Sequence, residues 1–184
     1  MKKLATIISR IFEPMVVISV LTVVGALYAG LQGSQFWSFF LVVLVLAVIP
    51  VTIFRVWLFN NRRVDWDIID RRKRIVPLLL LLGVVAGNTW IVSLWQNREI
   101  TYIFAIYLVW LVGLFLITLR FKISGHTSTI ALASLLVIKW FGLGLWPLLF
   151  TIPVVAWARV TLHQHTPLQT FVGAMYSVAI FFLF

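Results

Sequence analysis

Long apolar runs recur along the whole chain, separated by short stretches that contain polar residues or glycine. Runs of this length are typical of apolar helices, and the spacing of the breaks predicts seven of them. The predicted helices cover residues 11–32, 36–59, 75–96, 100–119, 127–141, 144–158 and 167–184. The fifth and sixth are shorter than the ~20 residues that cross a hydrocarbon core, and Pro147 and Pro153 interrupt the sixth. We expect these two helices to be tilted or broken.

The composition indicates a protein that is embedded in lipid. Hydrophobic residues make up 62% of the 184 residues, whereas Asp and Glu together number only five. So few charges cannot give a water-soluble domain its polar surface, so a soluble fold is excluded. We predict an all-α, polytopic integral membrane bundle of about six to seven transmembrane helices, in which residues 1–184 form a single domain.

The N-terminal residues resemble a secretory signal, because Lys2, Lys3 and Arg10 precede an apolar stretch. The apolar run from Pro14 to Leu31 is nevertheless longer than the ~7–15 residues usual in such a signal. We therefore expect this run to be retained as the first membrane helix.

The distribution of Lys and Arg predicts the orientation of the bundle. Two predicted helices separate the loop at 60–76 from the segment at 120–126, and two more separate that segment from residues 159–169. All three polar stretches, together with the N-terminus, should therefore reach one membrane face. That face holds every Lys and Arg except Arg98 and Lys139. The positive-inside rule places it in the cytoplasm, and we expect the protein in the cell inner membrane.

The net charge of +10 favours anionic lipid headgroups as partners. Aromatic residues arranged for single-strand binding do not accompany the cations, so nucleic acid is not an expected partner. The nine tryptophans are more typical of interfacial belts and lipid-facing packing than of a cofactor site. The pattern defines no oligomeric state.

The segment before the fifth predicted helix combines a cation, a glycine and a histidine. Lys122, Ser124, Gly125 and His126 follow one another within five residues. Gly125 lets the backbone approach a ligand closely, and Ser124 and the first amides of the helix can donate to an anion. Taken alone, the segment is more typical of an ordinary helix N-cap preceded by an interfacial lysine.

A second polar cluster precedes the last predicted helix. Arg159 carries a planar fork of donors that suits phosphate oxygens, and His165 lies just before a helix start marked by Pro167. Gln169 follows His165 by one helical turn and can accept the imidazole N–H. This cluster alone is also typical of interfacial polar residues. A short helical hairpin between the two clusters would return His165 to the side of His126, and together they indicate a split phosphate site.

A third cluster occupies the loop and helix start at residues 60–77, where nine charged residues gather. Such a loop is most often a solvated connection whose charges neutralise one another. Two functional interpretations remain open: Lys73 and Arg74 complete the phosphate site, or the aspartates hold magnesium against a diphosphate.

Metal chemistry has little support elsewhere in the sequence. The absence of cysteine excludes disulfides, thiol catalysis and thiolate metal sites. His163 and His165 form an H-x-H pair, but three histidines without a neighbouring carboxylate or thiolate make a poor metal site. We predict no metal and no cofactor.

Residues 70–175 resemble the type 2 phosphatidic acid phosphatase superfamily, whose motifs are K-x6-R-P, P-S-G-H and S-R-x5-H-x3-D. Ser124, Gly125 and His126 match the second motif, with Ile123 in place of proline. The third motif is matched as follows: Arg159 and His165 have the expected spacing, Ala158 replaces the serine and Gln169 replaces the aspartate. In the first motif, Arg74 and Pro77 occur in the right order, and Lys73 and Lys122 are the candidates for its lysine. The chain is most similar to a membrane branch with K-x-S-x-H and H-T-P-x-Q.

The resemblance implies a metal-independent phosphatase that acts on a phospholipid or polyprenyl phosphate through a phosphohistidine. It makes His165 the nucleophile and His126 the acid that protonates the leaving alcohol. The phosphate oxygens would be held by Arg159, Ser124, the Gly125 amide, Lys122, Arg74 and Lys73. Gln169 would orient His165 but brings no charge to stabilise the imidazolium. In serine protease triads the analogous aspartate-to-amide change lowers turnover by about 10⁴, so slow catalysis is one expectation.

Two other functions remain open. The third cluster resembles the first aspartate-rich motif of UbiA-like intramembrane prenyltransferases at Asn61, Asp65 and Asp70. That family also needs a second aspartate-rich motif, which this sequence lacks because the acidic residues outside the third cluster are Glu13 and Glu99. The other alternative is a non-catalytic protein that binds or transports a lipid phosphate.

Overall fold

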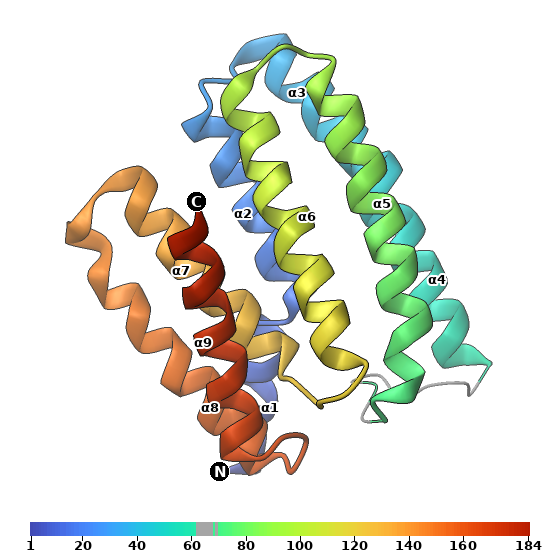
Figure 1. Ribbon diagram of the computed structural model, residues 1–184, viewed down its shortest axis with the longest axis vertical. Helices are drawn as coiled ribbons and strands as arrows, with labels where there is room; N and C mark the ends of the chain where they lie inside the picture. Colours follow the sequence, from blue (N-terminus) through green and yellow to red (C-terminus); the bar gives the residue numbers. More distant parts are fainter. Residues whose placement is uncertain (62–67, 69) are drawn as a thin grey trace. The chain divides into compact units, whose positions relative to one another are not determined.

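The computed structural model describes residues 1–61, 68 and 70–184, and this part of the chain is helical and contains no strand (Figure 1). Within these described residues, five helical segments are long and apolar enough to cross a membrane. They are Lys2–Tyr28, Gly33–Asn60, Arg72–Ser93, Arg98–Thr118 and Leu143–Thr161. The expected all-α fold is therefore confirmed, whereas the number of membrane crossings stays a prediction.

Every predicted apolar segment is helical in the structure. The α-helices in chain order are α1 (Lys2–Ile11), α2 (Pro14–Tyr28), α3 (Gly33–Val43), α4 (Ile49–Asn60), α5 (Ile75–Ser93), α6 (Arg98–Thr118), α7 (Gly125–Phe141), α8 (Thr151–Thr161) and α9 (Pro167–Leu183). Three short segments of other helix types are η1 (Leu44–Val48), η2 (Arg72–Arg74) and η3 (Leu143–Phe150). With 17 residues each, α7 and α9 are about 26 Å long at 1.5 Å per residue, less than a full hydrocarbon span.

The breaks between these segments follow the prolines. Pro14 begins α2, so the helical N-terminus forms a separate helix, α1, that the apolar pattern did not predict. Pro50 lacks an amide hydrogen, and its ring would collide with the carbonyl group four residues earlier in a regular α-helix; the π-helical η1 relieves this conflict. The predicted break in the sixth segment is confirmed, because Pro147 lies inside the 3₁₀ segment η3.

Contacts divide the chain into two compact units: unit 1 comprises Met1–Val24 and Lys122–Phe184, and unit 2 comprises Gly25–Phe121. In unit 1, α7 packs against α9, η3 and α8, and α1 packs against α8. Within this unit the N-terminus, the start of α7 and the loop between α8 and α9 lie toward one end, and the C-terminus lies toward the other (Figure 1). The two predicted site segments of this unit thus share one end.

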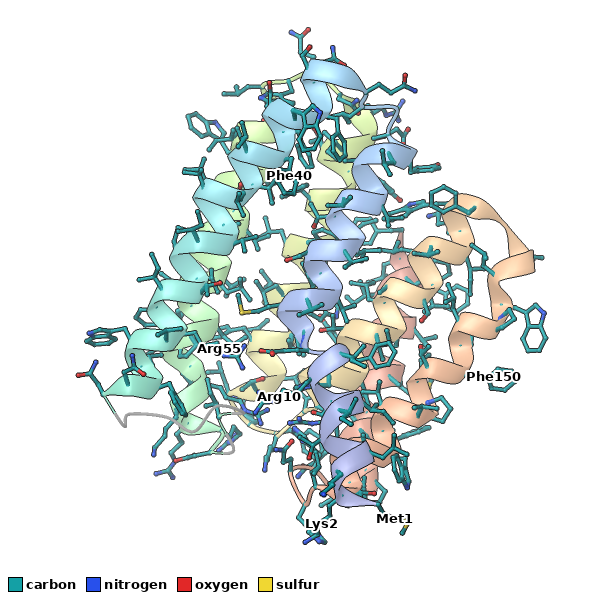
Figure 2. The ribbon with its side chains drawn as sticks, turned by 180° about the vertical axis from the view of Figure 1, so that it is seen from behind. Met1, Lys2, Arg10, Phe40, Arg55 and Phe150 are labelled. Atoms are coloured by element: carbon teal, nitrogen blue, oxygen red, sulfur yellow. The ribbon has the colours of Figure 1, made fainter. Side chains whose placement is uncertain are left out.

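Many large apolar side chains of unit 1 lie on its surface. Phe150 is 61% exposed and Phe182 is 80% exposed, and Figure 2 shows Phe150 pointing away from the ribbon, with Lys2 near the free end of α1. Surfaces of this kind are stable against lipid tails or a partner protein rather than against water. They agree with the apolar helices described above.

Unit 2 is built around α6, which packs against α5. Its core contains Phe104 and Phe39, whose ring centroids lie 6.1 Å apart in an edge-to-face arrangement. Asn97 caps the start of α6 by accepting a hydrogen bond from the Ile100 amide at 3.1 Å. At the other end of α6, Arg71 donates to the carbonyl of Leu119, so one cation of the basic loop stabilises the end of this helix.

The closest helix contact of unit 1 lies between α7 and α9 at Gly173. A methyl group added at Gly173 would lie 2.7 Å from the carbonyl oxygen of Ser124 and 2.7 Å from Thr127 Oγ1. One turn further along α9, Ser177 donates to the carbonyl of Ser128 at 2.6 Å. Small residues spaced by four therefore let the two helices approach closely, as in many membrane helix pairs.

This contact gives a stability prediction. Gly173→Ala should lower the free energy of unfolding by ~1–3 kcal/mol, because the backbone at Ser124 cannot give way as a flexible side chain would. Gly125→Ala is the matched control, since a methyl group there meets nothing within 4 Å. Thermal unfolding in detergent measures both variants. Equal stability of Gly173→Ala and Gly125→Ala would show that α7 and α9 are not closely packed.

Candidate functional site

The start of α7 holds the first predicted motif. Ser124 is the N-cap: its Oγ accepts from the Thr127 amide at 3.4 Å, and its own amide donates to the carbonyl of Gln169 at 3.2 Å. Ser124 is fully buried. The N-cap interpretation of this serine is therefore confirmed. Its hydroxyl hydrogen is still available to a ligand, so phosphate binding by Ser124 stays a prediction.

Gly125 and His126 form the first turn of α7, directly after that cap. Open space surrounds Gly125 on the side where a side chain would project. His126 is 8% exposed and approaches Arg159, with 3.4 Å between His126 Nε2 and Arg159 Nη1. Because a guanidinium group has only donors, a hydrogen bond at this contact requires Nε2 as the acceptor.

The end of α8 brings the second motif back toward the first. The amide of Gln164 donates to the carbonyl of Arg159 at 3.1 Å, and that of His163 donates to Val160 at 2.9 Å. This pair of bonds is a Schellman motif, with His163 in its left-handed position at φ 54°. The His165 amide also approaches the Arg159 carbonyl, at 3.4 Å. Because α7 also packs against α8, the predicted hairpin between the two motifs is confirmed, and both His126 and His165 contact Arg159.

Arg159 is the most deeply buried cation of the site, with 1% of its surface exposed. Its Nη1 donates to Ser9 Oγ at 2.6 Å in addition to its contact with His126. Unit 1 contains six Lys and Arg residues but a single carboxylate, Glu13. A buried guanidinium group in so cationic a unit is suited to bind an anion that comes from outside the protein.

His165 is held by the residue that the spacing predicted. His165 Nδ1 lies 3.0 Å from Gln169 Oε1, which also accepts from the Thr166 amide at 3.2 Å. The Thr166 amide can only donate, so the shared atom must be an oxygen and Nδ1 must carry the hydrogen. The lone pair of the neutral imidazole is then on Nε2. Thr166 and Gln169 complete a capping box at the start of α9, which fixes this geometry.

Three further residues, Lys122, Lys73 and Arg74, were predicted as phosphate ligands. Lys122 is half-buried and lies three residues before α7 begins, in unit 1. Lys73 and Arg74 belong to unit 2, where Arg74 Nε donates to the carbonyl of Ile68 at 2.7 Å. Their part in a phosphate site therefore stays a prediction.

The residues considered for metal binding differ in their surroundings. His163 is exposed whereas His165 is 6% exposed, so the H-x-H pair does not share one environment. In the third cluster, Asn61 Nδ2 donates to the carbonyl of Trp57, and Asp70 accepts from the Arg72 amide. Asp65 and Asp67 lie outside the described residues. Among residues 1–61, 68 and 70–184, no three His, Asp or Glu side chains gather into a metal site.

Sequence reasoning missed two residues of the site. Ser9 lies 150 positions from Arg159 and belongs to a helix that was not predicted, so nothing in the sequence connected them. Gly173 was visible only as one glycine in an apolar run. Its spacing of four from Ser177, on the helix that follows the third motif's His165, is the signal that could have indicated close packing.

Comparisons of the chain with known proteins find no match. No protein-family model matches the chain, and no curated protein or solved structure is significantly similar to it. The resemblance to type 2 phosphatidic acid phosphatases therefore rests on the motif residues themselves.

Proposed function

We propose that this chain is an integral membrane lipid-phosphate phosphatase with its site at the cytoplasmic face of the cell inner membrane. The observation that carries the proposal is the contact of both motif histidines with one buried arginine: His126 Nε2 approaches its Nη1 at 3.4 Å, and the His165 amide approaches its carbonyl at 3.4 Å. A nucleophile, an acid and a phosphate-binding cation are the groups that phosphoryl transfer through a phosphohistidine needs.

The first step transfers the phosphoryl group to the protein. His165 Nε2 attacks phosphorus, since Gln169 holds Nδ1 as the donor. Arg159 and the Gly125 amide stabilise the equatorial oxygens. The bound phosphate takes over the Arg159 N–H that points at His126, which lets His126 Nε2 hold a proton. The phosphorus–oxygen bond to the lipid breaks, and this proton passes to the departing alkoxide.

The second step regenerates the site. His126, now neutral, takes a proton from water, and the resulting hydroxide attacks phosphorus. The phosphorus–nitrogen bond breaks, inorganic phosphate leaves, and His165 returns to its neutral form. Activity should fall at low pH, where His165 gains a proton, and at high pH, where His126 loses the one that it donates.

The neutral side chain of Gln169 favours a second candidate, a non-catalytic protein that binds a lipid phosphate. An amide orients His165 as a carboxylate would, but it does not stabilise the imidazolium that forms during transfer. Binding needs Arg159 and the start of α7, whereas turnover also needs His165 as a nucleophile.

Phosphate release from a lipid panel separates these functions. Purified protein is incubated with phosphatidate, phosphatidylglycerophosphate, polyprenyl phosphate and polyprenyl diphosphate, once with a chelator and once with magnesium. We expect release of inorganic phosphate that resists the chelator. Binding of these lipids without release would support the non-catalytic candidate, and magnesium-dependent prenyl transfer would support a UbiA-like enzyme.

Gln169 gives the most direct test of the third motif. Gln169→Ala should lower the turnover rate at least about tenfold, because His165 Nδ1 loses its acceptor and the other tautomer becomes accessible. It also removes half of the capping box, at a cost of ~0.5–2 kcal/mol. Gln169→Asp, with the charge of the wider superfamily, should keep or raise the rate. Gln169→Glu introduces the same charge and also keeps the length of the side chain, so it separates the effect of charge from the effect of side-chain length.

Rates are to be measured beside thermal unfolding, so that loss of the cap is not mistaken for loss of chemistry. A fully active Gln169→Ala protein would remove Gln169 as the group that orients His165.

A further inference from the structure

An apolar pocket of about 340 Å³ lies within unit 1, between α2 on one side and α7 with the start of α8 on the other. Val16 and Val20 line it from α2, and Ile130, Ala133 and Val137 line it from α7. The two polar side chains of the lining bond within the protein: Thr151 Oγ1 donates to the carbonyl of Leu148 at 2.6 Å, and Ser134 Oγ lies 3.3 Å from Thr151 Oγ1. The wall therefore offers a ligand little except hydrocarbon contact.

The pocket continues the helix face that carries His126. Residues 126, 130, 133 and 137 recur at intervals of three or four and so share one face of α7. At 1.5 Å per residue, the lining residues of α7 lie about 6–16 Å further along the helix than His126. The face of α7 that carries His126 at its start thus continues along the helix as the apolar wall of the pocket.

The helix α8 and the N-terminal helices also carry site residues at one end and line the pocket further along. On α8, Thr151 lines the pocket and Arg159 lies eight residues later on the same face, about 12 Å away. From the N-terminus, Ser9 contacts Arg159, whereas Ile11 and the first turns of α2 line the pocket. The polar cluster and the apolar pocket are therefore adjacent parts of one path.

We propose that this pocket holds a hydrocarbon chain of the lipid whose phosphate binds at His126 and Arg159. The inference rests on the proposed function for the position of the headgroup. The nature of the occupant follows from the lining of the pocket. The hydroxyl groups of the lining bond within the protein, so the pocket offers hydrocarbon contact, and the residues proposed to bind phosphate lie beyond its polar end. Each methylene that enters contributes about fourfold in affinity, so the site selects lipid phosphates over water-soluble phosphate esters.

A chain-length series with a matched pair of variants tests the pocket. Val20 lines it and is 58% exposed, so Val20→Phe narrows the pocket without disturbing packed residues. Val154 is 42% exposed on α8 outside the lining, so Val154→Phe is the control. Val137→Phe narrows the pocket from the opposite wall. The substrates are dihexanoyl, didecanoyl and dipalmitoyl phosphatidic acid in mixed micelles.

For wild type and Val154→Phe, KM should fall steeply from the dihexanoyl to the didecanoyl lipid. Val20→Phe and Val137→Phe should raise KM for the longer lipids at least about tenfold, the equivalent of two methylenes, and should leave the dihexanoyl KM and kcat near wild type. Active variants whose chain-length profiles match that of Val154→Phe would overturn the inference while the proposed function stands.

A second measurement is independent of turnover. Phosphatidic acid with a diazirine in its acyl chain should label α2 and residues 130–137 of α7, and Val20→Phe but not Val154→Phe should reduce this labelling. Such labelling without phosphate release would retain the pocket and reject the phosphatase. Labelling spread evenly over the exposed apolar helices would reject the pocket.

Discussion

Replacement of His165 by alanine is expected to abolish phosphate release from every lipid phosphate, because the proposed mechanism forms its covalent intermediate on His165 Nε2. Loss of a nucleophile that works as a unit with its acid costs about 10⁶ in kcat in the best-measured hydrolases. His126→Ala should cost less for a substrate with a good leaving group, since such a group departs without a proton. The phosphate monoester of a long-chain alkyl nitrophenol, compared with phosphatidic acid, measures the difference.

The covalent step can be observed directly. Rapid acid-free quenching with radiolabelled lipid phosphate should trap a base-stable phosphohistidine in wild type and in His126→Ala, but not in His165→Ala. His163→Gly is the control, because His163 is exposed and its left-handed backbone suits glycine. Trapped label in His165→Ala would assign the nucleophile to another residue.

Arg159→Met should separate binding from folding. Methionine fills a similar volume, and replacing a buried charge with an apolar side chain often leaves a protein as stable as before. The Ser9 hydroxyl and His126 Nε2 each lose a partner, at a cost of ~1–3 kcal/mol apiece, which the removal of a buried charge partly offsets. Turnover should nevertheless fall by about 10³ or more, because the cation that stabilises the phosphate oxygens is gone.

The matched control is Arg98→Met, at an exposed arginine at the start of α6. It should leave turnover near wild type. Arg159→Lys keeps the charge but not the planar fork, so its activity should lie between those of Arg159→Met and wild type. A folded Arg159→Met protein with normal kcat/KM would mean that Arg159 only supports Ser9 and His126.

The fold could be predicted where apolar runs and prolines determine it. The apolar runs located the helical segments from α2 to α9, and Pro147 marked the broken sixth segment. They merged α3, η1 and α4 into one predicted helix, because the run continues through Pro50. The separate helix α1 was missed because its charged residues resembled the flank of a signal sequence. Its burial pattern depends on packing instead: Ala5 and Ser9 are buried, whereas Leu4 and Ile7 are exposed. Such a pattern cannot be deduced without the neighbouring helix.

The site could be predicted to the extent that its contacts are local. The contact between His165 and Gln169 follows from a spacing of four, and the cap at Ser124 follows from its place before a helix. The approach of His126 to Arg159 required a hairpin of α7 and α8, which the break between the short apolar segments 127–141 and 144–158 made predictable. The bond between Ser9 and Arg159 joins distant segments without a shared motif, so only the folded chain reveals it.

The close contact at Gly173 has a consequence for motion during turnover. Because α9 has no space to slide past Ser124 and Thr127, α7 and α9 move as one rigid body that carries His126 and Gln169 together. Opening of unit 1 to admit a bulky lipid must then occur elsewhere. We expect it on the N-terminal side, where α1 ends before Pro14 and where Val16 and Val20 lie exposed beside the pocket. Hydrogen exchange should accordingly be slower along the contact between α7 and α9 than around Phe12 and Glu13, whose amides donate to Ile8 and Arg10 where α1 ends.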